Sequence, residues 1–283
     1  MKRKVITMFL ILALCLGLAS CGQKTNEGDA NKTDASNTEA AGVSDWDYIK
    51  EKGKMIIGIT LFEPMNFTDE NGDLTGFETE FAKAICAKLG IEADFQEINW
   101  TTKEVELNAK TIDCIWNGMT ITSERKETMS ISIPYMENMQ VLITKAENAT
   151  AYAESVDGKN LVAEAESAGE AIIKEEDFFK NVNYTAVDLQ SKAVMEVASG
   201  TADACVIDLI AASGMTGEGT NFPGLTPVME RSFGEEEYGI GFRKGDTELT
   251  QKVNDAIKEM MDSGELQTIA AKYRIEDRLI LAK

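Results

Sequence analysis

The stretch WNGMTITSER at residues 116–125 contains the residue types of a receptor for a carboxylate group. Gly118 lets the backbone approach a ligand closely, and Thr122 or Ser123 can cap a helix that begins there. Arg125 would then lie in the first turn, where a guanidinium beside free backbone N–H groups can bind a carboxylate. On these residues alone, a solvated arginine after a turn is the commoner arrangement. The pattern makes Arg125 a candidate carboxylate-binding residue, and these residues alone do not establish that role.

A second motif, which runs from Asp69 to Glu80, imitates a calcium-binding loop. Such a loop requires glycine at its sixth position for a sharp turn, and Leu74 occupies that position here. Asn71 and Gly72 instead form a dipeptide that is typical of a tight hairpin. The sequence also contains neither a GxxxxGK[ST] phosphate loop nor a GxGxxG dinucleotide fingerprint. We expect a hairpin at this motif, and no bound metal or cofactor in the protein.

The composition of the 283 residues excludes several classes of function. Lys and Arg total 28 against 48 Asp and Glu, and a net charge of −20 repels the phosphate backbone of nucleic acids. The absence of histidine removes imidazole catalysis and every zinc site that needs a histidine ligand. Cys86, Cys114 and Cys205 are widely spaced in apolar runs, which indicates buried thiols rather than a disulfide framework.

The N-terminus has the pattern of a secretory signal peptide over residues 1–20. Three cationic residues precede an apolar run of about a dozen residues, which is shorter than the roughly 20 that span a membrane. The following LASC sequence, which ends at Cys21, resembles the lipobox of bacterial lipoproteins. That resemblance implies cleavage before Cys21 and a diacylglyceryl lipid, with palmitate chains, on its thiol. An ordinary cleaved signal with an incidental cysteine is the alternative.

Residues 21–44 are rich in Gly, Asn, Thr, Ser, Ala and Asp and contain almost nothing large and apolar. Such a segment cannot bury enough surface to offset the entropy of ordering it, so we interpret it as a flexible tether. A lipid anchor and a tether would hold a folded body just outside a membrane.

The remaining chain alternates short apolar runs with helical periodicity, which predicts an α/β fold with mostly parallel sheets. The alternation occurs twice, which indicates two lobes. The expected strands are residues 55–59, 92–98, 112–116, 159–163, 184–187, 202–208 and 237–242. The expected helices are residues 77–89, 105–110, 168–173, 191–199 and a C-terminal helix that Gly264 interrupts.

The motif GMTITxxR that ends at Arg125 resembles the family 3 extracellular solute-binding proteins, which are amino-acid receptors of ABC importers. The similarity extends over residues 46–275 and includes GFExE at 76–80, IPY at 133–135 and GTADACVID at 200–208. It implies a periplasmic-binding-protein clamp of type II with a hinge of two strands. The implied lobe 1 is residues 45–135 and 239–283, lobe 2 is 141–233, and the hinge segments are 136–140 and 234–238.

The same resemblance implies a ligand site between the lobes. Arg125 and the Thr120 amide would hold the α-carboxylate of an amino acid, and Asp208 with the Gly118 carbonyl would hold its α-ammonium group. Trp100 would form an aromatic wall, although a plain core tryptophan is an alternative, and the Asp208 carboxylate could also cap a helix. The complete implied set is Phe62, Trp100, Gly118, Met119, Thr120, Arg125, Glu164, Ser167, Ala168 and Asp208.

Three departures from the family pattern bear on specificity. Where the family often has an aspartate shortly after the first strand, this chain has Ile59-Thr60 and is one residue shorter. Residues 166–168 read Glu-Ser-Ala instead of Gly-Ser/Thr-Thr, so only Ser167 clearly carries over. Glu164 lies where the family varies with the ligand's side chain. Because an unpaired buried carboxylate is costly, Glu164 either faces solvent or meets a donor on the ligand.

These observations predict a monomeric, lipid-anchored binding protein on the outer face of the cytoplasmic membrane. It would capture a polar amino acid and deliver it to the membrane permease of an ABC importer, without making or breaking a bond. Its partners would be the free amino acid, the permease subunits and the membrane through lipid on Cys21. The alternatives are a cyclohexadienyl-dehydratase-like enzyme on the same fold and an extracellular amino-acid sensor.

Overall fold

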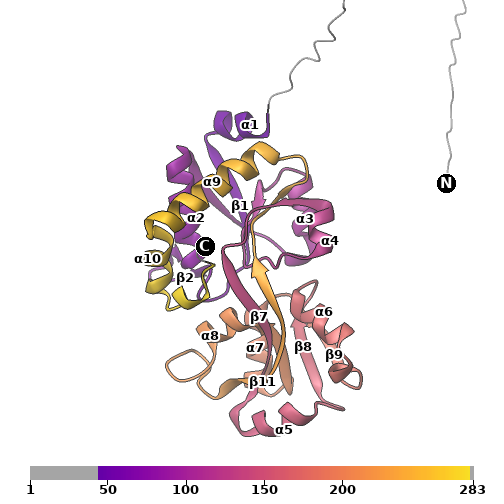
Figure 1. The fold of residues 1–283 in the computed structure, drawn as a ribbon. Helices are drawn as coiled ribbons and strands as arrows, with labels where there is room; N and C mark the ends of the chain where they lie inside the picture. Colours follow the sequence, from indigo (N-terminus) through magenta and orange to yellow (C-terminus); the bar gives the residue numbers. More distant parts are fainter. Residues whose placement is uncertain (1–43, 281–283) are drawn as a thin grey trace, which may run out of the picture. The chain divides into compact units, whose positions relative to one another are not determined.

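The structure is a computed structural model in which residues 44–280 are described (Figure 1). The predicted signal peptide, Cys21 and the predicted tether up to residue 43 lie outside the described residues. Ser44 is the N-cap of the first helix, α1 (Asp45–Lys52), and its hydroxyl accepts a hydrogen bond from the Asp47 N–H. Among the helices of residues 44–280, none combines the length and the hydropathy that crossing a bilayer requires.

The first sheet, which with its helices we call lobe 1, has the strand order β4-β1-β5-β12-β6. Strand β1 pairs in parallel with β4 and β5, whereas β12 pairs antiparallel with β5 and β6. The strands are β1 (Lys54–Ile59), β4 (Glu92–Glu97), β5 (Cys114–Ile115), β6 (Met129–Ile131) and β12 (Gly241–Arg243).

Helices cover both faces of this sheet. Helices α2 and α9 pack against one apolar face (Figure 1). Helix α3 packs against the other face, where its Leu107 lies in a cluster with Ile115 and Met129 of the sheet. The helices are α2 (Phe77–Leu89), α3 (Lys103–Asn108), α4 (Ser123–Thr128), α9 (Thr247–Ser263) and α10 (Glu265–Lys272). The hairpin predicted at Asn71-Gly72 joins β2 (Phe67–Thr68) to β3 (Leu74–Thr75).

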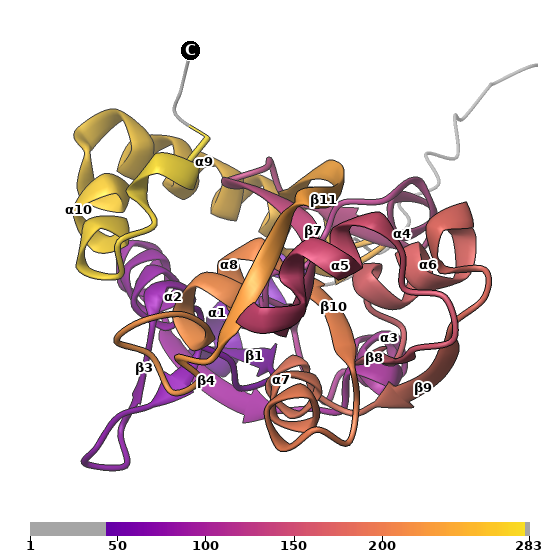
Figure 2. The ribbon, with the colours of Figure 1, turned by 90° about the horizontal axis from the view of Figure 1, so that it is seen from below.

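The second sheet, which with its helices we call lobe 2, has the order β11-β7-β10-β8-β9. Helices α6 and α7 lie on opposite faces of it (Figure 2) because successive strand residues point to opposite sides. The strands are β7 (Met136–Lys145), β8 (Asn160–Glu164), β9 (Asn183–Val187), β10 (Ala204–Asp208) and β11 (Leu225–Tyr238). The helices are α5 (Ala149–Glu154), α6 (Ala168–Glu175), α7 (Gln190–Ser199) and α8 (Leu209–Met215).

Two long strands connect the lobes. Strands β7 and β11 pair antiparallel from Met136–Tyr238 at one end to Lys145–Leu225 at the other, and they run from lobe 1 into lobe 2 (Figure 1). The register shifts between Phe233 and Glu235, around Gly234 with φ of +55°. The hinge segments expected at 136–140 and 234–238 therefore fall within this strand pair, next to a bulge.

The predicted two-lobed α/β class is confirmed, and both sheets are mixed rather than mostly parallel. Each sheet contains two parallel and two antiparallel strand pairings. The parallel pairs β1–β4 and β8–β9 are joined by helical crossovers, whereas β12 in the first sheet and β7 in the second run antiparallel to both of their neighbours. A short apolar run has no feature that reveals strand direction, which is why the sequence pattern missed this.

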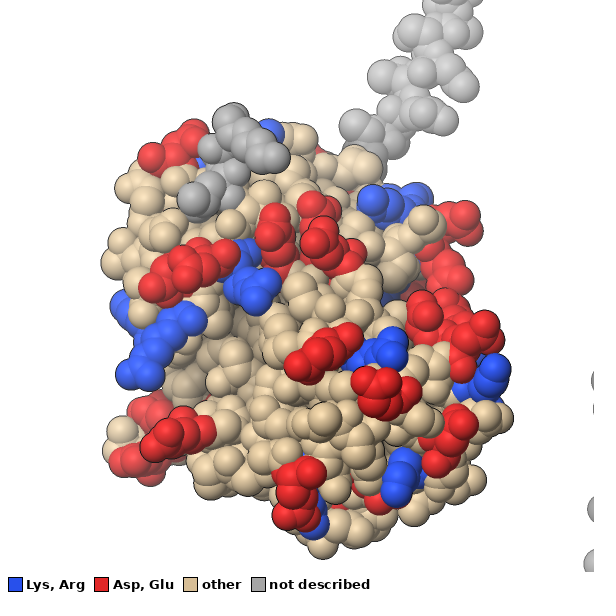
Figure 3. Space-filling view, turned by 60° about the horizontal axis from the view of Figure 1, so that its bottom comes forward, with Lys and Arg blue, Asp and Glu red and all other residues tan. Residues whose placement is uncertain are grey.

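The three cysteines predicted to be buried thiols are buried. The thiols of Cys86, Cys114 and Cys205 are buried and free, and burial raises the pKa of Cys86 to about 12. On the face shown in Figure 3, acidic and basic side chains are interspersed, so that face has no continuous basic patch.

Candidate functional site

A small cavity lies between the two lobes. Eight of the ten residues proposed from the sequence line it, and Asn117 and Gln190 line it as well. The lining consists of Trp100, Asn117, Gly118, Thr120, Arg125, Glu164, Ser167, Ala168, Gln190 and Asp208.

Arg125 is positioned by its own local sequence. Thr122 is the N-cap of α4, and its hydroxyl accepts a 3.1 Å hydrogen bond from the Arg125 N–H. The guanidinium donates to the Thr120 carbonyl at 2.7 Å and stacks over the Trp100 ring, 5.7 Å from its centroid. Burial lowers its pKa. Within residues 44–280, no carboxylate forms an ion pair with Arg125.

The Thr120 amide is available beside this guanidinium. The bridge between Thr120 and Tyr238 uses the Ile121 N–H and the Met119 carbonyl, which leaves the Thr120 N–H outside it. Ser167 lies on the opposite wall as the N-cap of α6, and its hydroxyl accepts a hydrogen bond from the Glu170 N–H. One wall of the cavity thus presents a cation and a backbone donor.

Asp208 lies across the cavity at the end of β10 and is 5% exposed. Its carboxylate accepts hydrogen bonds from the neutral side-chain amides of Asn138, Gln140 and Gln190. It occupies the N-cap position of α8 without making a capping hydrogen bond, so the alternative role does not use its side chain. Burial raises its pKa, and among the described residues no cation pairs with it.

Glu236, which the sequence analysis missed, lies beside Asp208. It extends from the hinge strand β11 and accepts hydrogen bonds from the same amides of Asn138 and Gln140. Burial and the neighbouring charge of Asp208 raise its pKa to about 7. No sequence signal identifies it, because it stands in an acidic run whose other members, Glu235 and Glu237, are exposed.

Glu164 is the second carboxylate in the cavity wall. It is 3% exposed at the end of β8, and its Oε1 has no hydrogen-bond partner within residues 44–280. Burial is the main cause that raises its pKa to about 8, with a further contribution from the charge of Asp208. Of the two alternatives in the sequence analysis, the solvent-facing one is therefore wrong.

Phe62 and Met119 lie behind the cavity rather than in its lining. The Phe62 ring is 3.1 Å from where a Cβ on Gly118 would stand, so it supports the Gly118 turn from beneath. Met119 is fully buried, and its thioether contacts the position of Gly241.

A buried hydrogen-bond network in lobe 1 fixes the loop that contains Asn117 and Gly118, which line the cavity. Glu78 accepts hydrogen bonds from the Gly118 N–H at 2.8 Å, from Asn66 and from the Tyr135 hydroxyl. Burial raises the pKa of Glu78 to about 7. Asn117 accepts a hydrogen bond from the Thr60 N–H and donates one to the Thr60 hydroxyl, so Thr60 helps to fix the loop.

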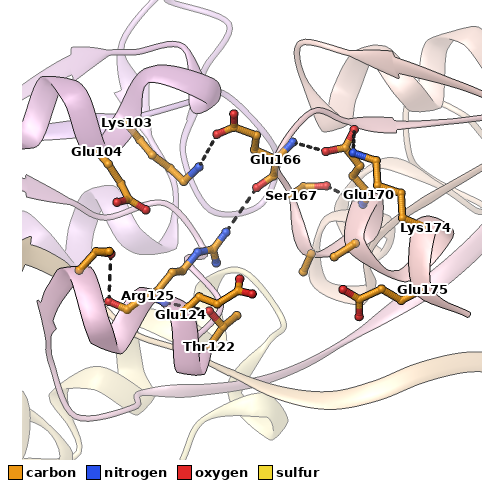
Figure 4. A pocket seen from close by; sticks show the side chains of 13 residues that line it. Lys103, Glu104, Thr122, Glu124, Arg125, Glu166, Ser167, Glu170, Lys174 and Glu175 are labelled. Atoms are coloured by element: carbon orange, nitrogen blue, oxygen red, sulfur yellow. Dashed lines mark hydrogen bonds and ion pairs between the residues drawn. The ribbon is translucent and has the colours of Figure 1, made fainter.

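Glu166 joins the lobes at the mouth of the cavity, in an adjoining hollow that shares Arg125, Ser167 and Ala168 with it (Figure 4). Its carbonyl accepts hydrogen bonds from Trp100 Nε1 at 3.2 Å and from Arg125 at 3.5 Å, and its carboxylate lies 3.4 Å from Lys103 Nζ. Its φ of +58° is one that glycine adopts more readily, in keeping with the glycine that the resemblance implies there.

Among residues 44–280, no group of His, Cys, Asp and Glu side chains could hold a metal ion.

Known proteins are similar to this chain in sequence. The family described as "Bacterial extracellular solute-binding proteins, family 3" matches residues 55–276. The chain is 30% identical to the L-cystine-binding protein TcyJ of Escherichia coli over 228 residues, which cover 80% of this chain and 84% of that protein. It is 30% identical over 284 residues to the ABC transporter glutamine-binding protein GlnH of Bacillus subtilis, with coverages of 97% and 98%.

A solved structure is similar as well. The ancestral amino acid-binding protein AncCDT-1, a precursor of cyclohexadienyl dehydratase, aligns with a TM-score of 0.71 and 30% identity. The alignment covers 81% of this chain and 99% of that one.

Proposed function

This chain belongs to the bacterial extracellular solute-binding proteins of family 3, and we propose that it captures one free amino acid between its lobes for an ABC importer. Its relatives TcyJ and GlnH bind cystine and glutamine, two ligands that share only the α-amino-acid group. A receptor for that shared group needs an anion site and a cation site a few ångströms apart.

The observation that carries the proposal is the pair of unmatched charges across the cavity. No ion pair within the described residues includes Arg125 or Asp208, and the partners of the Asp208 carboxylate are neutral amides and the Glu236 carboxyl. We propose that the ligand α-carboxylate binds Arg125 with the Thr120 N–H and the Ser167 hydroxyl. Its α-ammonium group binds Asp208 and the Gly118 carbonyl, and the Trp100 ring covers the site.

The placement of these groups couples binding to closure of the clamp. Arg125 belongs to lobe 1 and Asp208 to lobe 2, so a zwitterion between them is fully satisfied only when the lobes meet. The strand pair β7–β11 is the only covalent route between the sheets within the described residues, and the bulge at Gly234 lies on it. We propose hinge closure about this pair.

The cellular role follows from the family. The protein acts outside the cytoplasm, and we propose that lipid on Cys21 retains the monomer at the membrane beside its permease. Two acyl chains anchor a protein stably, whereas one does so only marginally. Cys21→Ala should release the protein from membranes or leave it unprocessed. Mature wild-type protein without lipid mass would contradict the anchor.

We propose that no reaction occurs at this site. The similarity to a dehydratase precursor makes the enzyme alternative specific enough to test. Incubation of the protein with prephenate or arogenate should leave both compounds unchanged, and their conversion at catalytic rates would identify an enzyme instead.

A ligand screen tests the binding proposal directly. The full chain, purified in detergent, should be warmed with each of the twenty amino acids in turn. A ligand at 100 times its dissociation constant adds about 2.7 kcal/mol to stability, which is measured as a higher melting temperature. If none of the twenty shifts the melting temperature or gives calorimetric heat, the proposed function is wrong.

A further inference from the structure

The charges that line the cavity do not balance. One guanidinium, Arg125, faces two carboxylates, Glu164 and Asp208. An α-amino acid matches Arg125 with its carboxylate and Asp208 with its ammonium group, which leaves Glu164 unmatched. With both carboxylates ionised, a neutral side chain leaves one excess negative charge in the cavity, a cationic side chain leaves none, and an anionic side chain leaves two; a neutral ligand is therefore accommodated only with Glu164 protonated.

The groups around Glu164 do not supply the missing cation. Lys103 is the nearest candidate, but its ammonium group contacts the Glu166 carboxylate and the Trp100 carbonyl at the cavity mouth. Asp208 and Asp188 oppose ionisation of Glu164, whereas Arg125 and Lys103 favour it less strongly than burial disfavours it. The Oε1 atom has no partner within residues 44–280.

We propose that the ligand is an amino acid with a cationic side chain and that Glu164 is the residue that selects it. This inference rests on the proposed function, because it assumes that Arg125 and Asp208 hold the α-groups. Glu164 is the last residue of β8, and β8 pairs directly with β10, whose last residue is Asp208. A ligand side chain that extends from the α-carbon along this wall therefore meets Oε1 of Glu164.

The pH dependence of binding follows from this assignment. In the empty cavity, burial raises the pKa of Glu164 to about 8, so the carboxyl is mostly protonated at neutral pH. A cationic side chain stabilises the ionised form, and binding then releases a proton. Affinity for a cationic ligand should fall by up to about tenfold per pH unit below pH 8, and affinity for a neutral one should not.

The decisive experiment compares matched ligands on the full chain by calorimetry. L-Arginine and L-citrulline have the same shape but differ in charge, and L-lysine and L-norleucine form a second pair. Of the two cationic ligands, the one that binds more tightly should have an affinity at least about 30-fold higher than its neutral partner, as expected for a buried charge pair. Glu164→Gln should remove most of that preference by weakening the cationic ligand alone. Glu175→Gln, an exposed carboxylate at the cavity mouth, should retain the preference.

Each result decides a different statement. If wild-type protein binds citrulline, norleucine or another neutral amino acid more tightly than arginine and lysine, this inference is overturned and the amino-acid site stands. If the protein binds no amino acid at all, the proposed function itself fails. Proton release near one per cationic ligand, measured in two buffers of different ionisation enthalpy, would support the role of Glu164 even if Glu164→Gln fails to fold. Equal release with neutral ligands would contradict it.

Discussion

The two walls of the cavity are built in opposite ways. In lobe 1, the shortest hydrogen bonds of Arg125 are with neighbours within five residues, the Thr122 cap and the Thr120 carbonyl, and its guanidinium also stacks on Trp100 and contacts the Glu166 carbonyl. In lobe 2, Asp208 is positioned by amides that lie 18, 68 and 70 residues away, on α7 and on the hinge strand β7. The cationic wall is thus a local motif, whereas the anionic wall exists only after distant strands have assembled.

This difference has a consequence for ligand binding. The Arg125 wall forms with its own loop and helix, while the Asp208 wall includes Gln140 and Glu236 from the strands that bend at the hinge. A change in the hinge alters the anionic wall directly and the cationic wall only through closure. Four substitutions or conditions test this contrast.

The largest effect is expected from Arg125→Ala, which removes the cationic wall. A buried carboxylate without its partner typically costs about 2–5 kcal/mol, or roughly 30-fold to several-thousand-fold in affinity. Arg125→Lys should remain impaired because an ammonium group cannot reproduce the planar fork. The matched control is Lys126→Ala, an exposed neighbour on the same helix that lines no part of the cavity. Wild-type affinity in Arg125→Ala, measured by calorimetry, would remove Arg125 from the site.

A smaller loss is expected from Asp208→Asn, which removes the anionic wall's charge and keeps its shape. The new amide group also faces the donors of Asn138, Gln140 and Gln190, so it must turn its oxygen toward them. We expect affinity to fall by about 1–3 kcal/mol, the cost of a lost charge-assisted hydrogen bond. Thermal unfolding without ligand separates this from misfolding. Unchanged affinity would show that the ammonium group binds elsewhere.

The buried acids of both lobes predict how stability depends on pH. The pKa is raised to about 7 for Glu78 in lobe 1 and to about 8 for Glu164 in lobe 2. Because both values exceed the ordinary 4.5, their contribution is complete below pH 4.5 and is lost as the pH rises through 7 and 8. Chemical unfolding of the ligand-free protein should thus give higher stability at pH 5 than at pH 8.

The slope of this pH dependence can be assigned to a lobe. Each titrating group changes the unfolding free energy by on the order of 1 kcal/mol per pH unit. Glu164→Gln should flatten the part between pH 7 and 8 and leave the part below pH 7 that is due to Glu78 and Glu236. Stability that rises with pH over the same range would contradict the assignment of both acids as buried and neutral.

The smallest effect is expected from Glu166→Gly at the junction of the two walls. The substitution removes an ion pair whose carboxylate side chain is 57% exposed, a type worth about 1 kcal/mol or less. It also relieves the positive φ of a non-glycine residue, so the two effects nearly cancel in the free energy of unfolding. Lys52→Ala is an unsuitable control because that ammonium group pairs with buried Asp113, whereas Lys192→Ala removes an exposed pair. A decrease of more than about 2 kcal/mol in the free energy of unfolding would contradict this expectation and show that Glu166 stabilises the contact between the lobes.

Much of the fold could be predicted because its signals are local. Gly76 and Gly90 bracket α2, Asn71-Gly72 turns the β2–β3 hairpin, and Gly264 separates α9 from α10. In each case the backbone conformation of one or two residues ends or turns an element whatever surrounds it. Helices α1 and α5 were missed, because short helices are stabilised by packing more than by their own sequence.

The sequence by itself determined the two-lobed class, the cap that presents Arg125 and the candidate roles of Thr120, Ser167 and Asp208. The tertiary structure alone decided the rest of the site. It placed Phe62 and Met119 behind the cavity, brought Gln190 and Glu236 to Asp208, and buried Glu164 without a partner. The reason is physical: a cap or a turn depends on adjacent residues, whereas the burial and charge environment of a carboxylate depend on which distant strands fold against it.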